Sequence, residues 1–363
     1  MQSLFDDISS GVRAMAPSRF PYSRFLFALA IGLVGAVIFV YLNMPLPWML
    51  GSLTTTTIAA LGGTRIAAPS VVRTPMILIV GVMVGATFTP DILQRFTEWW
   101  PTIVGLALLG IASGLTCFIY LRAFTDFNFS TSYFSAMPGG LIEMLTLADE
   151  HGGDVRTVAL FHSVRILVIV FSLPLIVRAI EGVGMGATGA VGFSIVDLQF
   201  VDFAWIAATA VVGVVVGHLL RMPASYLLGP LLISAAIHAA GLSEFKLPVE
   251  VLNVAQLVIG TSVGCRFAGV ASATIFRLFR LAVGMTIVLL IVTALFALAA
   301  SNFSEFGFVP IFLAYSPGGL AEMSLVAVAL HIEVAFVASH HIVRLFVVMG
   351  GAPLAFALVK RFR

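Results

Sequence analysis

Two polar motifs recur inside the apolar parts of this 363-residue chain. In the first, Pro-Gly-Gly precedes a glutamate: Pro138, Gly139 and Gly140 precede Glu143, and Pro317, Gly318 and Gly319 precede Glu322. The second is His-x-x-Arg, at His162 with Arg165 and at His341 with Arg344. Ionisable side chains at membrane depth are costly and are functional by default. Because arginine stays charged at any attainable pH, each of these arginines needs a glutamate or a bound anion as its partner.

The Pro-Gly-Gly segments predict helices that start inside the membrane. Ser316 can cap a helix whose first position is Pro317, and the glycines let a backbone or a solute approach closely. The first turn of such a helix has unsatisfied N–H groups and the positive end of the dipole, so it can bind an anion. Met137 stands where the other copy has Ser316, so this cap is not duplicated. The alternative is a plain turn between two spans.

The charged residues of both motifs can bind a solute or lock the fold. Glu143, Glu322, Arg165 and Arg344 would line or lock the site, and an ion pair that only locks the hairpins stays open as an alternative. His162 and His341 titrate near physiological pH and could carry protons, or they could be core histidines. The predicted substrate-binding set is Pro138, Gly139, Gly140, Glu143, His162, Arg165, Ser316, Pro317, Gly318, Gly319, Glu322, His341 and Arg344. We predict no catalytic residue, no metal ligand and no cofactor.

The elements that must position these residues are membrane helices. The chain is 60% hydrophobic and 10% charged, whereas a soluble chain carries about 25% charged residues. Apolar stretches of about 20 residues, long enough to cross a membrane, recur from end to end. The sequence therefore predicts an all-α polytopic membrane protein, with broken or re-entrant helices at the Pro-Gly-Gly motifs. GxxxG spacings, such as Gly81/Gly85, Gly110/Gly114, Gly213/Gly217 and Gly260/Gly264, predict close helix packing.

The chain contains the same pattern twice. Over 137–170 and 316–349, 14 of 34 positions carry the same residue at a constant offset of 179. This duplication predicts five parts: a cytosolic segment at 1–24, a first membrane repeat at 25–177, a linker at 178–202, a second repeat at 203–359, and a basic cytosolic tail at 360–363.

Charge predicts how the two repeats are oriented. With five crossings per half, 14 of the 17 Lys and Arg residues that can be assigned to a side fall inside, where such residues gather. With six crossings per half, the excess of Lys and Arg on the inner side would be smaller. Repeats with an odd number of crossings are inverted, an arrangement found in transporters with broken helices. We therefore expect two inverted repeats of about five transmembrane helices each, with both termini in the cytoplasm.

The doubled PGGL-x-EM and H-x-V-R motifs, with an LLGP-type motif ahead of each, resemble the AbrB-type duplicated membrane protein family. Members of this family have also been labelled ammonia monooxygenases. The resemblance covers nearly all of the chain beyond about residue 25 and implies a bacterial inner-membrane protein. No established catalytic residue can be carried over from the family.

These observations favour a secondary transporter or permease for a small polar, anionic solute, working by alternating access around a midplane site. Two alternatives stay open: a membrane-bound sensor or regulator that uses the same pocket, and a metal-dependent monooxygenase. The expected partners are the lipid bilayer, the solute, a coupling proton or ion, and a second copy of the chain in a homodimer. A net charge of +2, spread between apolar segments, argues against nucleic acid. We expect no enzymatic activity.

Overall fold

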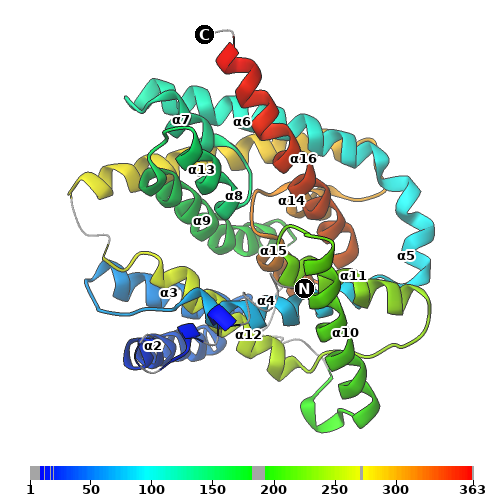
Figure 1. Ribbon diagram of the computed structural model, residues 1–363. Helices are drawn as coiled ribbons and strands as arrows, with labels where there is room; N and C mark the ends of the chain where they lie inside the picture. The colour runs from blue at the N-terminus through cyan, green and yellow to red at the C-terminus, as the bar shows by residue number, and fades with distance from the viewer. Residues whose placement is uncertain are drawn as a thin grey trace. The chain divides into compact units, whose positions relative to one another are not determined.

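The computed structural model describes residues 9–11, 13–16, 18, 20–181, 193–269 and 273–361, and within these ranges the regular structure is helical. The first half contains α2 (Tyr22–Tyr41), α3 (Pro47–Leu61), α4 (Ser70–Gly85), the short α5 (Pro90–Arg95) and η1 (Phe96–Trp99), α6 (Trp100–Phe124), α7 (Phe129–Ala136), α8 (Leu141–Glu150) and α9 (Val155–Glu181). The second half contains η2 (Ile195–Asp197), α10 (Phe200–Leu219), α11 (Ser225–Ala239), α12 (Val249–Cys265), α13 (Ala273–Ser301), α14 (Phe308–Tyr315), α15 (Leu320–Ala329) and α16 (Val334–Arg361) (Figure 1).

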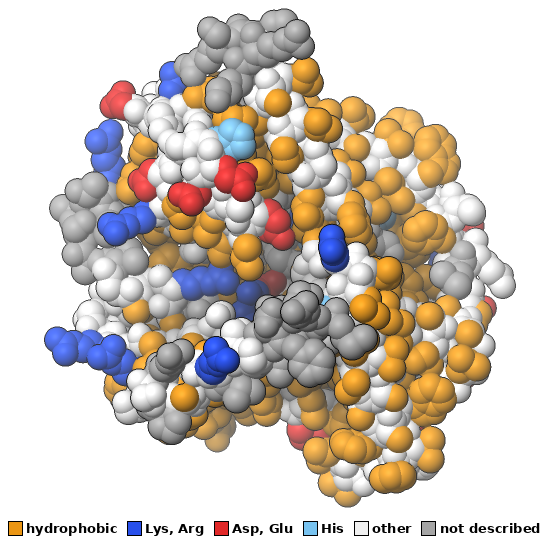
Figure 2. Space-filling view, in the orientation of Figure 1, with side chains coloured by type: hydrophobic (Ala, Val, Ile, Leu, Met, Phe, Trp, Pro, Cys, Tyr) orange, Lys and Arg blue, Asp and Glu red, His pale blue; other side chains and the backbone are white. Residues whose placement is uncertain are grey.

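The predicted fold class is confirmed: the chain is an all-helical polytopic membrane protein. Six helices, which fall within 22–41, 96–124, 155–180, 200–219, 276–301 and 334–358, are long and apolar enough to cross a membrane. Large apolar side chains remain exposed on them: Phe200 is 83% exposed and Ile111 is 71% exposed. Figure 2 shows such side chains over much of the visible face. A soluble monomer rarely exposes so much contiguous apolar surface.

Four helices are shorter than the predicted spans. They are α3, α4, α11 and α12, with 15 to 17 residues each. At 1.5 Å per residue they extend about 23–26 Å, less than the ~30 Å hydrocarbon core. The number of crossings per half, the inverted arrangement and the cytoplasmic termini therefore stay predictions. Residues 182–192 of the predicted linker lie outside the described residues, as do residues 1–8, 12, 17, 19, 362 and 363 of the predicted cytosolic ends.

The helices form two compact units, and each unit contains segments from both halves of the sequence. Unit 1 comprises residues 1–95, 174–270 and 324–335, and unit 2 comprises 96–173, 271–323 and 336–363. The predicted boundary between repeats therefore does not separate these units. The whole predicted substrate-binding set falls within unit 2.

Unit 1 packs corresponding helices of the two halves in the same way. α2 packs on α3 and α10 packs on α11, while α3 packs on α12 and α4 packs on α11. Glycines make the close approaches: a Cβ at Gly35 would overlap the carbonyl oxygen of Gly51, and one at Gly229 would overlap that of Gly213. The GxxxG prediction is confirmed at Gly81/Gly85, Gly213/Gly217 and Gly260/Gly264, where an added Cβ would overlap atoms of a facing helix. It is wrong at Gly110, which has open space at its Cβ position.

Candidate functional site

Both Pro-Gly-Gly segments break a helix in unit 2. α7 ends at Ala136 and α8 begins at Leu141, while α14 ends at Tyr315 and α15 begins at Leu320. Proline disfavours helical backbone at the residue before it. Accordingly, Met137 has φ −64° and ψ 134°, and Ser316 has φ −62° and ψ 137°. The predicted break is present in both copies.

The predicted helix start at Pro317 is wrong. Ser316 has extended backbone before Pro317, and it ends α14 instead of capping the next helix. Its hydroxyl donates backward to the carbonyl of Leu313 at 2.9 Å and contacts the sulfur of Met323 at 3.2 Å. The N-terminal end of the second helix therefore lies at Leu320, three residues later than expected.

In the first half, α7 and α8 form a hairpin whose two outer ends meet. Asn128 caps α7 by accepting from the N–H of Thr131, and its amide donates to the carbonyl of Gly152 at 2.9 Å. Ser130, in the first turn of α7, donates to the carbonyl of His151, just after α8, at 2.8 Å. The chain therefore enters and returns at the same end, as a re-entrant segment does, with the Pro-Gly-Gly motif at its tip.

A cluster of apolar side chains holds this hairpin in place. Tyr133, Phe134 and Met144 of the hairpin are buried against Val348 and Phe356 of α16. The Tyr133 hydroxyl donates to the carbonyl of Ala352 on the same helix at 2.8 Å. The hairpin of the first half is thus packed on the helix that carries the second His-x-x-Arg motif.

The two arginines bind the backbone of the broken segments. Arg165 donates from Nη1 to the carbonyl of Met137 at 2.9 Å and from Nη2 to that of Gly139 at 3.0 Å. Arg344 repeats the pattern 179 residues later, because its Nη1 donates to Ser316 and its Nη2 donates to Gly318. Each arginine therefore holds its own broken helix through two carbonyl oxygens, a different contact from the Glu–Arg ion pair of the locking alternative.

The two histidines add a second matched contact. His162 Nε2 donates to the carbonyl of Phe134 at 2.9 Å, and His341 Nε2 donates to that of Leu313 at 3.3 Å. Both imidazoles are buried, at 0% and 1% exposure. The copies differ at Nδ1: in His341 it accepts from Arg344 Nη2 at 2.7 Å, whereas in His162 it has no hydrogen-bond partner among the described residues.

Each glutamate folds back over the glycine before its helix. A Cβ at Gly140 would overlap Oε2 of Glu143, and one at Gly319 would overlap Oε2 of Glu322. Gly140 is the N-cap of α8, so Glu143 occupies the third helical position, from which a glutamate reaches back in a capping box. This geometry explains why a glycine precedes each helix.

Both copies of the motifs line one cavity, which we call the motif cavity. Its volume is about 110 Å³, and it lies wholly within unit 2. Its lining consists of six pairs of residues related by the offset of 179, plus His341: Pro138/Pro317, Gly139/Gly318, Gly140/Gly319, Leu141/Leu320, Arg165/Arg344 and Ile166/Leu345. Two guanidinium groups are its charged lining; Glu143 and Glu322 are not among the lining residues.

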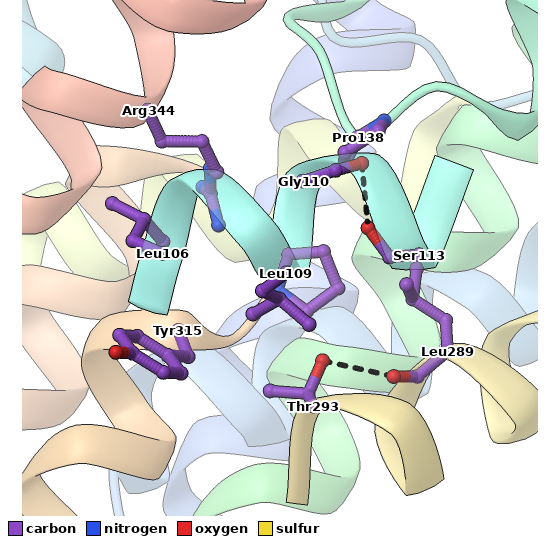
Figure 3. A pocket seen from close by; sticks show the side chains of 10 residues that line it. Leu106, Leu109, Gly110, Ser113, Pro138, Leu289, Thr293, Tyr315 and Arg344 are labelled. Carbon is purple, nitrogen blue, oxygen red and sulfur yellow. Dashed lines mark hydrogen bonds between the residues drawn. The ribbon is translucent and has the colours of Figure 1, made fainter. Parts of the chain in front are cut away.

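A second and smaller pocket, the helix pocket, shares Pro138, Pro317 and Arg344 with the motif cavity. Its volume is about 10 Å³, which approaches the space that a single water needs. Figure 3 shows the Arg344 side chain reaching into it beside α6, with the Tyr315 ring next to Leu106. Gly110 also lines this pocket, which accounts for the open space at its Cβ position.

Sequence reasoning missed the residues that fix the walls of both cavities. The aliphatic lining of the motif cavity includes Leu141, which belongs to the doubled PGGL-x-EM motif but was not predicted to bind a solute, and Ile166, which directly follows H-x-V-R. Tyr315 donates to the carbonyl of Thr102 on α6 at 2.6 Å, and His340 Nε2 lies 2.8 Å from Oγ1 of the same threonine. His340 has no counterpart in the first half, so the duplication did not single it out.

The histidines are committed to backbone contacts. A ring nitrogen that donates to a carbonyl is protonated and cannot ligate a metal at the same time, which applies to Nε2 of His162 and of His341. Among the residues that the structure describes, no three His, Cys, Asp or Glu side chains are grouped as a metal site would require.

The comparison with known proteins agrees with the doubled motifs. A family model described as "Transition state regulatory protein AbrB" matches residues 48–360. The chain belongs to the AbrB family. It is 25% identical over 331 residues to the "Putative regulator AbrB" of Escherichia coli (strain K12), covering 89% of this chain and 92% of the relative. It is 24% identical over 295 residues to the "Uncharacterized protein YhjN" of Bacillus subtilis (strain 168), covering 78% of this chain and 77% of that relative. The expected family membership is thereby confirmed.

Proposed function

We propose that this AbrB-family chain is a secondary transporter or permease for a small anionic solute, and that the solute binds in the motif cavity. The observation that carries the proposal is the convergence of both motif copies on one cavity whose charged lining is two arginines. Two like charges that face one cavity repel each other, and an anion between them relieves that repulsion.

The arrangement of the guanidinium groups supports anion binding. Each has five N–H donors in a rigid fork, and each commits two nitrogens to carbonyl oxygens. The carbonyl bonds fix the orientation of the fork without neutralising its charge. Arg165 is only 3% exposed. Because its charge is held away from bulk water, its attraction to a bound anion is screened less than it would be at the surface.

The location of the whole site within unit 2 is compatible with alternating access. Every lining residue of the motif cavity belongs to one compact unit, so the site can stay intact while access to it changes. We place the protein in the bacterial inner membrane with both termini in the cytoplasm, coupled to a proton or ion and assembled as a homodimer. We propose no enzymatic activity and no cofactor.

Uptake by proteoliposomes tests the function. Purified full-length protein would be reconstituted, and the flux of radiolabelled malonate, propionate and sulfate would be measured against empty vesicles. Arg165→Gln and Arg344→Gln should each abolish the flux. Arg122→Gln is the matched control, because the exposed Arg122 also donates to a carbonyl, that of Phe127 at 2.8 Å, but lies outside the motif cavity. Flux equal to that of empty vesicles, or flux unchanged in both motif variants, would contradict the proposal.

A membrane-bound sensor is the second candidate, favoured by the name of the Escherichia coli relative, "Putative regulator AbrB". A sensor would bind the anion in the same cavity without moving it across the membrane. Saturable binding in detergent, together with no flux in proteoliposomes, would favour the sensor over the transporter.

A further inference from the structure

The motif cavity is a matched two-ended site. All but one of its lining residues form pairs from the two halves of the chain, and each half contributes one proline, two glycines, two aliphatic side chains and one arginine. A pocket built from two equivalent walls presents the same chemistry at two positions. Its best ligand therefore carries the same chemical group at both ends.

The charge of the cavity sets the charge of that ligand. The lining has two arginines and neither motif glutamate, because both carboxylates fold back over Gly140 and Gly319 instead. The guanidinium groups bind neutral carbonyls, so two positive charges remain to be balanced. An unbalanced charge held away from water is costly, and one monoanion would leave half of this charge unpaired.

Arg165 has donor capacity that its backbone contacts do not use. Its Nε is buried and has no hydrogen-bond partner among the described residues, while its Nη atoms bind Met137 and Gly139. An arginine fork matches the two oxygens of a carboxylate.

The apolar walls and the size of the cavity define the rest of the ligand. Four aliphatic side chains line it, namely Leu141, Ile166, Leu320 and Leu345. They would contact methylene groups and offer no hydrogen bonds to a hydroxylated body. A volume of about 110 Å³ admits only a compact molecule.

We propose that the motif cavity selects a short aliphatic dicarboxylate, with one carboxylate at Arg165, the other at Arg344, and the methylene body against the four aliphatic side chains. This inference rests on the proposed anion-binding function and narrows its substrate class.

Isothermal titration of the detergent-purified full chain at neutral pH tests this selectivity. The probes are malonate, monomethyl malonate, succinate, propionate and sulfate. Monomethyl malonate is the critical comparison, because it has nearly the same shape as malonate but only one charge. We expect malonate to bind at least about tenfold more tightly than its half ester, since a second charge-assisted pair contributes more than the 1.4 kcal/mol that a factor of ten requires. Sulfate, whose charge is not divided between two ends, should bind more weakly than malonate.

Substitutions of the two arginines test whether malonate binds in the motif cavity. In Arg165→Gln and in Arg344→Gln the preference for malonate over monomethyl malonate should fall to about onefold, whereas Arg122→Gln should keep it. Gel filtration checks that each variant is folded. If a variant does not fold, Leu320→Phe replaces it, because filling the cavity should weaken malonate binding by at least about tenfold.

The outcomes separate the two proposals. Binding of monoanions as tight as that of malonate would overturn the dicarboxylate assignment and leave the anion transporter standing. A malonate preference that survives both arginine substitutions would place the selective site elsewhere and overturn the assignment. No binding of any probe to the wild-type protein would overturn both.

Discussion

The bonds from the arginines to the broken helices predict that lysine cannot replace arginine there. Arg165→Lys keeps the charge, but a lysine has a single nitrogen and cannot span two carbonyls as the guanidinium fork does. One of the bonds to Met137 and Gly139 would be lost. A hydrogen bond to a charged group contributes about 1.5–3 kcal/mol. Because Arg165 is buried, water cannot replace the lost bond, and we expect the free energy of unfolding to fall by about this amount.

Unfolding in mixed detergent, titrated with sodium dodecyl sulfate and followed by circular dichroism, measures this free energy. Arg344→Lys should have a smaller effect in the same direction, because Arg344 is more exposed than Arg165. Arg122→Lys is the matched control. Its guanidinium also binds a carbonyl, but in an exposed position where water can substitute, so its effect should stay within about 0.5 kcal/mol.

The reasoning would be refuted by Arg165→Lys and Arg122→Lys variants of equal stability. That result would mean that the carbonyl bonds do not hold the broken segment, and that the two arginines of the motif cavity are free to move.

Three further substitutions test the local packing, and the same titration measures how far each one lowers the free energy of unfolding. Asn128→Ala removes the cap of α7 and the bond to Gly152, and should cost about 1 kcal/mol or slightly more; no change would show that the base of the hairpin is held by other contacts. Gly319→Ala places a Cβ on Oε2 of Glu322 and should cost about 1–3 kcal/mol, and a neutral result would mean that the glutamate can leave the glycine freely. Gly229→Ala forces α10 and α11 apart and should cost at least as much, whereas the control Gly350→Ala, with nothing near its Cβ position, should be neutral or stabilising. Equal effects at Gly229 and Gly350 would contradict the close helix crossing.

The sequence was sufficient to predict the helical class and the position of the breaks. Long apolar segments predict membrane helices, because a backbone inside lipid has no water to bind and a helix satisfies its hydrogen bonds internally. Proline disfavours helical backbone at the residue before it, but Pro75, Pro174, Pro230 and Pro353 lie inside continuous helices. The breaks are therefore predicted by proline together with the two glycines that follow it, at 138–140 and 317–319. The duplication was visible because the same residue types recur at one offset.

The arrangement of the site could not be predicted from the sequence. The acceptors of Arg165 are backbone carbonyls 26 and 28 residues upstream, and a carbonyl has no sequence signature. The glutamate was the obvious partner by charge, but it folds back over the glycine three residues before it. Likewise, each half of the sequence is divided between two units because distant segments pack together. The length of the apolar segments and the spacing of the motifs do not predict this packing.

The central claim is that the two halves of the chain build one shared anion site rather than two separate ones. Equilibrium binding of radiolabelled malonate, or of radiolabelled propionate if monoanions bind more tightly, measures the number of sites per chain directly. The shared cavity predicts one site per chain, and a lower affinity at that one site in both Arg165→Gln and Arg344→Gln. Two sites per chain, with half of the binding lost in each variant, would contradict it.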